Sequence, residues 1–426
     1  MAGYIPPYVE CMNSHTNFHS DYDLLICGGG LVGASLALML KPLGLRVALI
    51  EAQPFSGAAH PSFDERTTAL SNSTRRIFEA INAWPLLQPQ VTPIKRIHVS
   101  DQGRFGFARL SAEEQGIAAM GYVVANHHMG AALWQRLQQE QIEVIAPARV
   151  THVNIAETAR SIVLDTGAGG ERTLITRLVI AADGAQSVVR DAVGIGHRHA
   201  DYGQVAVIAN ALTEKFHDHV AYERFTPHGP IAVLPLSDAR VGLVWTVATD
   251  RAAEVLGWND VEFLANFQQE FGFRLGRFVK VGDRHNYPLA LIRADAHTAD
   301  RIAVIGNAAQ MLHPIAGQGL NLGLRDAATL AEVLADALRQ DSNHFDAGSD
   351  LVLKRYSEWR QQDSKRIIAF TDGLVRAFNQ PLGLVKVMRD MGLLAFDMLP
   401  SAKHALSQLS VGASGQVPRL ARGAPL

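Results

Sequence analysis

The chain has 426 residues, 48% of them hydrophobic and 19% charged, so it can bury more than one core and we expect two or more domains. A formal net charge of −2 and the lack of Lys/Arg runs argue against nucleic acid as a partner. Two cysteines, Cys11 and Cys27, are too few for a disulfide framework and favour a reducing compartment such as the cytoplasm.

The first twenty residues lack a basic start, an apolar run and the arginines of an organellar targeting segment. We therefore expect a flexible N-terminal tail at residues 1–20. No stretch of about 18 uncharged apolar residues occurs, which argues against a spanning helix. The expected protein is soluble in the cytoplasm, or peripheral at the cytoplasmic face of the inner membrane.

The first regular elements predict a strand, a glycine turn, a helix and a second strand. Residues 24–27 are a short apolar run, residues 31–40 are small and apolar as in a buried helix, and residues 47–50 return as a strand. Gly44 fits the left-handed position after the helix. The pattern is typical of a parallel βαβ unit that is covered on both faces.

The turn of this unit carries Gly28, Gly30 and Gly33 in the spacing GxGxxG, and Glu51 ends the second strand. The first glycine permits a tight turn, the second lets the backbone approach a pyrophosphate, and the third allows close packing of helix on strand. The diphosphate would bind the N–H groups of the helix N-terminus, and Glu51 would accept hydrogen bonds from a ribose. The sequence predicts a dinucleotide site.

Two later apolar strands end in similar turns. Residues 178–182 lead into Asp183 and Gly184, and residues 302–305 lead into Gly306 and Asn307. Ligands of open parallel sheets bind outside the carboxyl ends of the strands. We therefore expect one nucleotide-binding domain built from discontinuous segments, namely residues 21–85, 126–198 and 296–345.

The run Gly317-Gln318-Gly319-Leu320-Asn321 precedes a predicted helix, so its N–H groups form a cradle for an electron-rich edge. Beneath the pyrimidine end of a flavin, this dipole would stabilise the negative charge that develops on reduction. The extra glycine-rich backbone favours FAD over a nicotinamide as the resident cofactor.

The rest of the chain predicts two further regions. Short β-rich segments between Asp201 and Leu291 indicate an inserted, largely antiparallel sheet, which we assign with residues 86–125 to a substrate domain at residues 86–125 and 199–295. A C-terminal helical region is expected at residues 346–426. Its stretch 384–399 has apolar residues at helical spacing and fits an interfacial helix, or equally one packed on the body or on a second subunit of a homo-oligomer.

The glycine fingerprint and the two later turns, in this order, resemble the single-component FAD-dependent aromatic hydroxylases of the p-hydroxybenzoate hydroxylase fold. The resemblance covers residues 21–399. Residues 60–66, 223–230 and 306–326 resemble the ubiquinone-biosynthesis hydroxylases, and among them those that act on 2-polyprenyl-6-methoxyphenol. The implied fold is α/β: a Rossmann-like FAD-binding domain with a parallel sheet, an inserted antiparallel sheet that holds substrate, and C-terminal helices.

The resemblance implies roles for the matching positions. The first turn and Glu51 would hold the adenosine diphosphate, Arg66 would reach the flavin, and Asp183 would serve the diphosphate and the ribityl chain. Ser187 and Arg190 would also assist the nicotinamide reductant. The implied cofactor-binding residues are Gly28, Gly30, Gly33, Glu51, Arg66, Asn126, Asp183, Gly184, Asn307, Pro314, Gly317, Gln318, Gly319, Leu320 and Asn321.

Three of these positions carry a reservation. The family usually has aspartate where this chain has Asn307, and an amide oxygen accepts a ribityl hydrogen bond without charge assistance. The family often has arginine near the pyrophosphate where Asn126 or His127 must substitute. Arg66 has an alternative reading as a surface arginine that pairs with Asp64 or Glu65.

The resemblance also implies the reaction. NADPH (or NADH) reduces FAD and leaves, O₂ adds to give a C4a-hydroperoxide, and an electron-rich phenol attacks the distal oxygen. The flavin carries the chemistry while the protein orients substrate and excludes water, so neither a nucleophile triad nor a metal is needed, and we assign no catalytic residue. The histidines show no metal-ligand spacing. With one nucleotide fingerprint, the nicotinamide should bind transiently.

The implied substrate is a polyprenylated phenol, hydroxylated to a 1,4-benzoquinol under the inserted sheet. Its hydrocarbon tail implies contact with a membrane surface or delivery by other ubiquinone-biosynthesis enzymes. Alternatives are a C5 or C6 hydroxylase of the same pathway, an FAD-dependent oxidase or reductase of a lipid, and a non-catalytic flavin scaffold. The candidate pocket residues, each of whose aromatic members could instead be core, are Arg224, Phe225, Leu234, Pro235 and Trp245.

Overall fold

The apolar runs that end at glycine turns pair as the central strands of one parallel sheet. The computed structural model describes residues 20–54, 66–104, 106–156, 159–312, 317–379, 408, 411–412 and 414–426. Leu24 pairs with Leu178 on one side and with Val47 on the other, both in parallel register. The order of the path is β18 (Thr298–Ala299), β19 (Ile302–Val304), β11 (Glu171–Ala181), β1 (Tyr22–Cys27), β2 (Val47–Ile50) and β8 (Glu143–Ile145).

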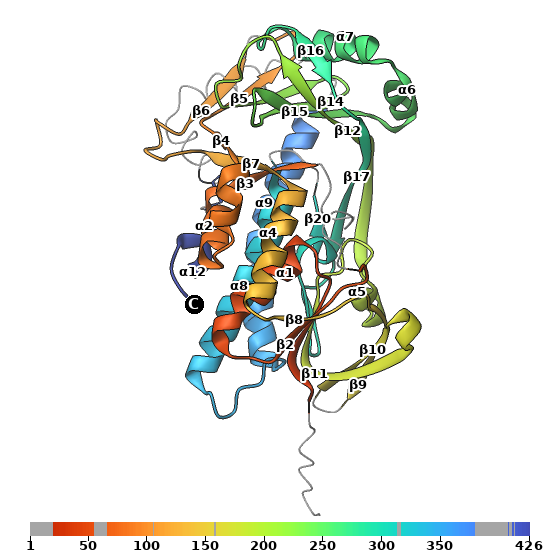
Figure 1. Cartoon of the computed structure of the whole chain (residues 1–426), viewed down its shortest axis with the longest axis vertical. Helices are drawn as coiled ribbons and strands as arrows, with labels where there is room; N and C mark the ends of the chain where they lie inside the picture. The colour runs from red at the N-terminus through yellow and green to blue at the C-terminus, as the bar shows by residue number, and fades with distance from the viewer. Residues whose placement is uncertain are drawn as a thin grey trace, which may run out of the picture.

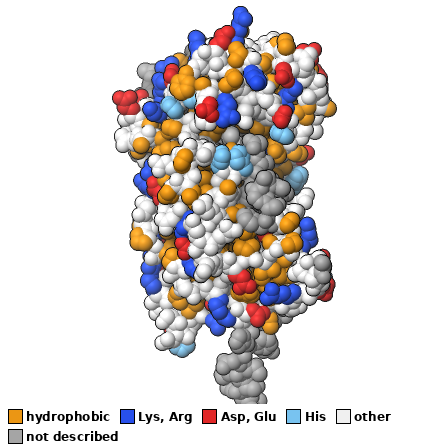
Figure 2. Space-filling model, in the orientation of Figure 1, with side chains coloured by type: hydrophobic (Ala, Val, Ile, Leu, Met, Phe, Trp, Pro, Cys, Tyr) orange, Lys and Arg blue, Asp and Glu red, His pale blue; other side chains and the backbone are white. Residues whose placement is uncertain are grey.

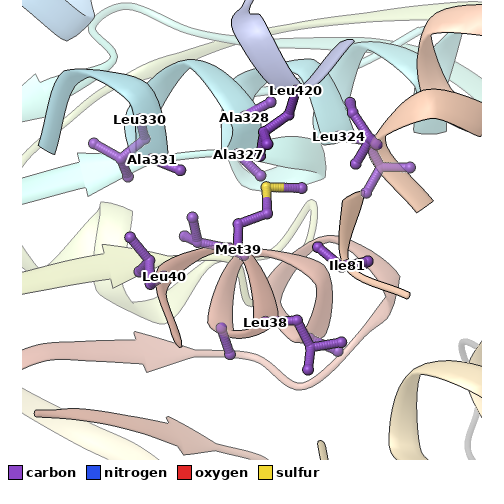
Figure 3. Close-up of a cluster of buried hydrophobic side chains, with 14 of the residues drawn as sticks. Leu38, Met39, Leu40, Ile81, Leu324, Ala327, Ala328, Leu330, Ala331 and Leu420 are labelled. Carbon is purple, nitrogen blue, oxygen red and sulfur yellow. The ribbon is translucent and has the colours of Figure 1, made fainter. Parts of the chain in front are cut away.

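Helices cover one face of this sheet, as Figure 1 shows. α1 is apolar all round and is therefore buried on nearly all sides, against the long helix α8 and against α4. In Figure 3 the Met39 side chain reaches from α1 toward Ala327 of α8 and Leu420 near the C-terminus. The helices of this layer are α1 (Leu31–Leu40), α4 (Asn126–Gln139), α8 (Gln318–Gln340), α9 (Asp350–Asn379) and the short α12 (Arg419–Arg422).

The opposite face carries a second apolar cluster, which includes Leu25, Val179 and Val304. The antiparallel strands β9 (Arg149–Ala156) and β10 (Ala159–Asp165) extend from β11 there, and α5 (Val188–Ala192) lies beside β9. None of the helices in the described part of the chain combines the length and the apolar character needed to cross a bilayer.

A second sheet, which we call the roof sheet, spans the other end of the molecule in Figure 1. Its pairings are antiparallel except that of β13 with β5. The path is β20 (Gln310–Met311), β17 (His285–Ala294), β12 (His197–Thr213), β15 (Arg240–Ala248), β14 (Gly229–Pro235), β13 (Val220–Thr226), β5 (Arg96–Asp101) and β6 (Phe107–Ser111), with β16 (Phe278–Val281) beside β12.

The two faces of the roof sheet have different neighbours. The outer face packs against α6 (Ala252–Gly257) and α7 (Asp260–Phe271), and Trp245 lies in that core. The inner face meets a small sheet, β3 (Thr67–Ser71), β7 (Gly121–Ala125) and β4 (Thr92–Ile94). A Cβ at Gly242 would lie 3.0 Å from Thr67 Oγ1, which places the inner face directly against β3. Two helices, α2 (Asn72–Ala80) and α3 (Trp84–Leu87), complete this region.

The expected fold class, an α/β FAD-type domain with an inserted antiparallel sheet and C-terminal helices, is confirmed. The sequence analysis did not anticipate α6 and α7 within residues 201–291. α8 begins at Gln318, so the run 317–321, which the sequence places before a helix, forms the first turn of that helix. Of the expected tail at residues 1–20, only Ser20 is described; it is buried, and its oxygen accepts a hydrogen bond of 2.7 Å from Arg46. The helix expected at 384–399 lies outside the described residues.

Candidate functional site at three strand-end turns

The first turn is built from glycines because the backbone leaves no room for side chains. Gly28 has φ +111°, and a Cβ there would lie 2.4 Å from the carbonyl oxygen of Ala182 in the second turn. A Cβ at Gly33 would lie 2.0 Å from the oxygen of Gly28. Gly30 begins α1 without a side-chain cap, so N–H groups of the first helical turn remain available to an anion.

Glu51 lies beside this turn at the end of β2. Its Oε2 accepts a hydrogen bond of 2.7 Å from the N–H of Gly29, and its Oε1 accepts one of 2.8 Å from the N–H of Gln53. The side chain is buried. The carboxylate is thus fixed where the sequence analysis expects a ribose partner.

The second turn presents a carboxylate with an unused oxygen. Asp183 Oδ2 accepts a hydrogen bond of 3.2 Å from the N–H of Val189, whereas Oδ1 is buried without a partner among the described residues. Burial raises the pKa of Asp183, and its negative charge adds to the effect of burial in raising the pKa of the Cys27 thiol. A buried acceptor of this kind fits a hydroxyl or N–H of a ligand. At Gly184, φ is +89° and a Cβ would meet nothing within 4 Å.

The third turn lies against the first. A Cβ at Gly306 would lie 3.3 Å from the side chain of Val32 in α1, and the Gly306 N–H donates to Asp326 Oδ2 at 3.0 Å. Asp326 is itself held by the buried Arg360 at 2.7 Å. Asn307 is exposed between its buried neighbours. Nothing in the sequence indicated that Asp326 and Arg360 hold the third turn in place.

Arg190 joins the second turn to the third. Its Nη1 donates hydrogen bonds of 3.1 Å to the carbonyl oxygens of Ala185 and Ala308. The side chain is buried and also pairs with Asp191 at 3.0 Å. We expected Arg190 to assist the nicotinamide; the structure instead places its guanidinium within the protein, where it ties the two turns together. All three turns therefore converge.

Residues 317–321, the glycine cradle, form the start of α8. Gly317 adopts the left-handed conformation, with φ +60°, and no side chain caps the helix. Gln318, Gly319 and Leu320 are half-buried, and a Cβ at Gly319 would meet nothing within 4 Å. Within the part of the chain that the structure describes, no side chain caps these N–H groups, which leaves them available to a bound ring edge. Pro314 and His313 lie outside the described residues.

Asn321 shapes the cradle through four hydrogen bonds. Its Oδ1 accepts from the N–H of Ser71 at 2.9 Å and from Thr74 Oγ1 at 2.7 Å. Its Nδ2 donates to the oxygens of Ala69 at 2.9 Å and of Gly317 at 2.7 Å. These bonds use the full capacity of an amide side chain, so Asn321 braces α8 against β3 and leaves only its backbone for a ligand.

Arg66 and Asn126 meet where the small sheet approaches the roof sheet. The Arg66 guanidinium lies 4.4 Å from the ring centroid of Tyr287 on β17. Asn126 donates its N–H to the Arg66 oxygen at 2.8 Å, and its Oδ1 accepts from Thr68 Oγ1 at 2.8 Å. The contact between Arg66 and Tyr287 links the segment that leads into β3 to the roof sheet, and Asn126 holds the Arg66 backbone in place.

The candidate pocket residues separate onto two faces. Leu234 belongs to the inner face with Ala69, and Phe225 shares that face by strand alternation. Arg224, Pro235 and Trp245 occupy the outer face, so we correct their assignment as pocket walls. Arg224 Nε donates to the Glu270 oxygen at 2.9 Å, Pro235 pairs with the core residue Val241, and Trp245 lies 5.4 Å from Phe267 between ring centroids.

The site fits an extended dinucleotide. Uncapped helix N-termini lie at its two ends, a buried carboxylate oxygen lacks a partner between them, and open space adjoins Gly184 and Gly319. The turns would hold the diphosphate and the ribityl chain, and the glycine cradle would hold the ring. Fold and site together define a dinucleotide-dependent oxidoreductase whose ring site is covered by a β-sheet.

Comparisons with known proteins agree with this class. A family model for the FAD binding domain matches residues 21–371. Ubiquinone hydroxylase UbiL of Rhodospirillum rubrum is 37% identical over 95% of this chain and 93% of its own length, and 3-demethoxyubiquinol 3-hydroxylase of Escherichia coli is 30% identical over 92% and 98%. The fold matches that of p-nitrophenol 4-monooxygenase PnpA of Pseudomonas putida DLL-E4, with a TM-score of 0.75 at 18% identity over 93% of this chain and 99% of that one.

The chain belongs to the FAD-dependent aromatic hydroxylases, in the group of the ubiquinone-biosynthesis hydroxylases. It is a flavoprotein monooxygenase that uses FAD, NAD(P)H and O₂. The family expectation drawn from the three turns is thereby confirmed.

Proposed function

We propose that this protein hydroxylates the ring of a polyprenylated phenol, and that its substrate is a 2-polyprenyl-6-methoxyphenol, which it converts to the 1,4-benzoquinol. The similarity of residues 223–230 to hydroxylases of that substrate supports this choice, since this segment forms the β13–β14 hairpin of the roof sheet. The relatives named as ubiquinone hydroxylases support the substrate class.

The apolar inner face of the roof sheet is the observation that carries the proposal. Ala221 and Leu234 pack against Ala69, and a Cβ at Gly317 would lie 3.2 Å from the Cβ of that same alanine. The roof residues and the glycine cradle therefore meet at β3. A prenylated ring, which is largely hydrocarbon, gains about 0.8 kcal/mol for each CH₂ that it buries on such a surface.

FAD, when bound, supplies the electron transfer and the activation of oxygen. The chain contributes the surfaces around it. The N–H groups of the glycine cradle stabilise negative charge at the ring edge, the roof sheet excludes water, and Phe225 with Leu234 orients the phenol. Because the first turn carries the single dinucleotide fingerprint, the nicotinamide, NADPH or NADH, binds transiently on the same scaffold.

The test is mass spectrometry of the quinone intermediates in a strain that lacks this protein. We expect 2-polyprenyl-6-methoxyphenol to accumulate, and labelled ¹⁸O₂ to enter the product of the purified enzyme. Accumulation of an intermediate blocked at C5 or C6 would favour the alternative ring positions, toward which the similarity to 3-demethoxyubiquinol 3-hydroxylase points. Product without label would indicate an oxidase or reductase of a lipid.

We also propose that the protein takes its substrate from a membrane surface, alone or with other ubiquinone-biosynthesis enzymes. Phe216 and Phe273 are 51% and 67% exposed at the far end of the roof sheet. The exposed Lys215 and Arg274 lie next to them in the chain. Exposed aromatic rings with basic neighbours suit an anionic bilayer surface.

A further inference from the structure

Glu223 is an acidic side chain in the middle of β13. Its neighbours Tyr222 and Arg224 point to the outer face, where the Tyr222 ring centroid is 5.6 Å from that of Phe271 and Arg224 binds the Glu270 oxygen. Alternation along the strand therefore directs Glu223 to the inner face, together with Ala221, which packs near β3 and β7. The carboxyl thus faces the side on which the glycine cradle lies.

The surroundings of Glu223 are apolar. It pairs with Ala232 on β14 and with Val99 on β5, and Leu234 follows on the same face. The structure records no hydrogen bond or ion pair for Glu223 among the described residues, and the side chain is half-buried. Burial alone raises the pKa of its carboxyl to about 8.

Few titratable groups share this face. β14 presents none, because its inner residues are Pro230, Ala232 and Leu234. β5 presents Asp101, two residues beyond Val99, and β3 and β7 contribute Thr67, Ala69 and Val123. Removal of the carboxyl from water, rather than a neighbouring charge, therefore sets its proton affinity.

We propose that Glu223 accepts the phenolic proton of the substrate, an inference that rests on the proposed function. The O–H bond of the phenol breaks, the proton moves to a Glu223 carboxylate oxygen, and the electron pair stays on the substrate oxygen. The resulting phenolate makes the ring electron-rich for hydroxylation. The carboxyl holds the proton while the substrate is bound and releases it to solvent after the product has left.

The chemistry matches this role. A general base works best when its pKa lies near the operating pH. An ordinary glutamate, with a pKa of about 4.3, is a poor acceptor for a phenol, whose pKa is about 10. Burial on the inner face brings the two proton affinities closer together. Arg224 and Phe225, the two residues after Glu223, were candidate pocket residues from the sequence, whereas Glu223 entered only as part of the segment 223–230. Strand alternation assigns a side chain to a face only when the neighbours on each face are known.

The experiment measures product formation by the FAD-loaded enzyme between pH 6 and 10, with 2-methoxy-6-prenylphenol as substrate. In the wild type, kcat should rise about tenfold per pH unit up to about pH 8 and then level off. Glu223→Gln should lose about 100-fold or more in kcat and also lose this rise. Glu223→Asp should restore part of both. FAD content and NADPH binding should match the wild type.

Glu270→Gln is the matched control. Glu270 is also half-buried and lies on the outer side of the roof sheet, and its Oε2 has no hydrogen-bond partner in the described part of the chain. It should keep the wild-type rate and pH profile. If Glu223→Gln instead forms product within about threefold of the wild type, with an unchanged pH profile, the proposal is overturned. Loss of activity with loss of FAD in every Glu223 variant would also overturn it, in favour of a structural role.

A binding measurement separates this inference from the proposed function. Quenching of flavin fluorescence gives the affinity for the phenol and for its methyl ether, which has no proton to transfer. At pH 9 the wild type should prefer the phenol by about tenfold, and Glu223→Gln should not discriminate. If the wild type binds the phenol but forms no product, the proposed function is wrong. The preference of the wild type for the phenol over its methyl ether still tests the role of Glu223 in that case. Equal discrimination by the variant would overturn the inference.

Discussion

At the scale of the residue, Asn307 is exposed while Gly306 and Ala308 on either side are buried. Its amide therefore projects from the third turn, where the family usually carries a carboxylate. We expect Asn307→Asp to bind FAD about 2–10-fold more tightly, because a charged acceptor strengthens a hydrogen bond to a ribityl hydroxyl. Titration of the apoprotein by flavin fluorescence measures this. Asn343→Asp, in the loop before α9, controls for the added charge, and clearly weaker binding by Asn307→Asp would contradict our placement of the turn.

His98 predicts a pH dependence of stability. Burial first, and then the positive charges of Arg274 and Arg109, lower its pKa to about 4. The unfolded chain, with a histidine pKa near 6.5, therefore binds more protons between these values, and stability falls as the pH drops through this window by up to about 3 kcal/mol.

Replacing His98 should reduce this loss. The centroid of its ring lies 5.8 Å from those of Phe107 and Tyr222, and neither buried ring nitrogen has a hydrogen-bond partner among the residues described, so phenylalanine suits the position. We expect His98→Phe to flatten the decline in the free energy of unfolding between about pH 6.5 and 4, measured with denaturant. A decline as steep as in the wild type would show that His98 is not its source and would point to His297, whose pKa is also about 4, or to His217, whose pKa is also lowered by burial.

Single residues also show what the sequence could reveal. Gly33 was predictable because the atom that a Cβ there would meet, the Gly28 oxygen, lies in the same turn, and Gly28 because its φ of +111° is required by the turn itself, although a Cβ at Gly28 would also meet Ala182 of the second turn. The brace formed by Asn321 was not, because it bonds to Ser71 across 250 positions. Trp245 was assigned to the pocket because an aromatic residue in a strand does not reveal which face meets the ligand.

At the scale of the element, α7 was missed although its local signal was present. Asn259 caps the helix and Glu262 completes a capping box, while Phe263, Phe267 and Phe271 recur every fourth residue on the buried side. Short strands on both sides led us to interpret the segment as sheet and loop. This omission affected the candidate site. Because α7 was not predicted, nothing was expected to cover the outer face of the roof sheet, and Trp245 was assigned to the pocket instead.

Two glycines of α8 allow an effect on the ligand site to be distinguished from an effect on the core within one helix. A Cβ at Gly319 meets nothing within 4 Å, whereas one at Gly323 would lie 3.0 Å from Val32 Cγ2 and 3.1 Å from Gly306 Cα. We expect Gly319→Val to leave the melting temperature of the apoprotein nearly unchanged, yet to weaken FAD binding about 100-fold, since the side chain would occupy the flavin space. Hydroxylation should then be abolished.

Gly323→Val is the matched comparison, one turn further along the helix. Overpacking against α1 should destabilise the apoprotein by about 1–3 kcal/mol, measured by denaturant unfolding. Wild-type FAD affinity and turnover in Gly319→Val would refute our placement of the flavin ring at the glycine cradle.

At the scale of the whole molecule, the convergence of three distant turns followed from a general property of parallel sheets, and this part of the fold was predictable. The placement of the roof sheet was not. It depends on the contact of Arg66 with Tyr287 and on the apolar cluster that Ala221 shares with Ala69, and these join segments that no local pattern connects. Likewise, the surface at the far end of the roof sheet emerges only when two separate loops are brought together.

That surface allows a test of the proposed membrane contact. The N–H of Lys215 donates to the Leu275 oxygen at 3.1 Å, which joins the loop of Phe216 to that of Phe273. Figure 2 shows Lys and Arg, together with Asp and Glu, alongside hydrophobic side chains at this end of the molecule. Anionic lipid would attract the exposed basic residues while the two rings enter the interface, each contributing about 1.5–3 kcal/mol if fully buried and less at the boundary.

We expect the wild type to sediment with vesicles that contain phosphatidylglycerol more than with pure phosphatidylcholine, and less as salt is added, because salt screens the basic residues. The double variant Phe216→Ser/Phe273→Ser should bind these vesicles about tenfold more weakly while still hydroxylating a short-chain phenol at the wild-type rate. Leu351→Ser, which removes a 71% exposed apolar side chain from the start of α9, should change neither property. Equal sedimentation of the double variant and the wild type would mean that the long-chain substrate arrives by another face or from a partner protein.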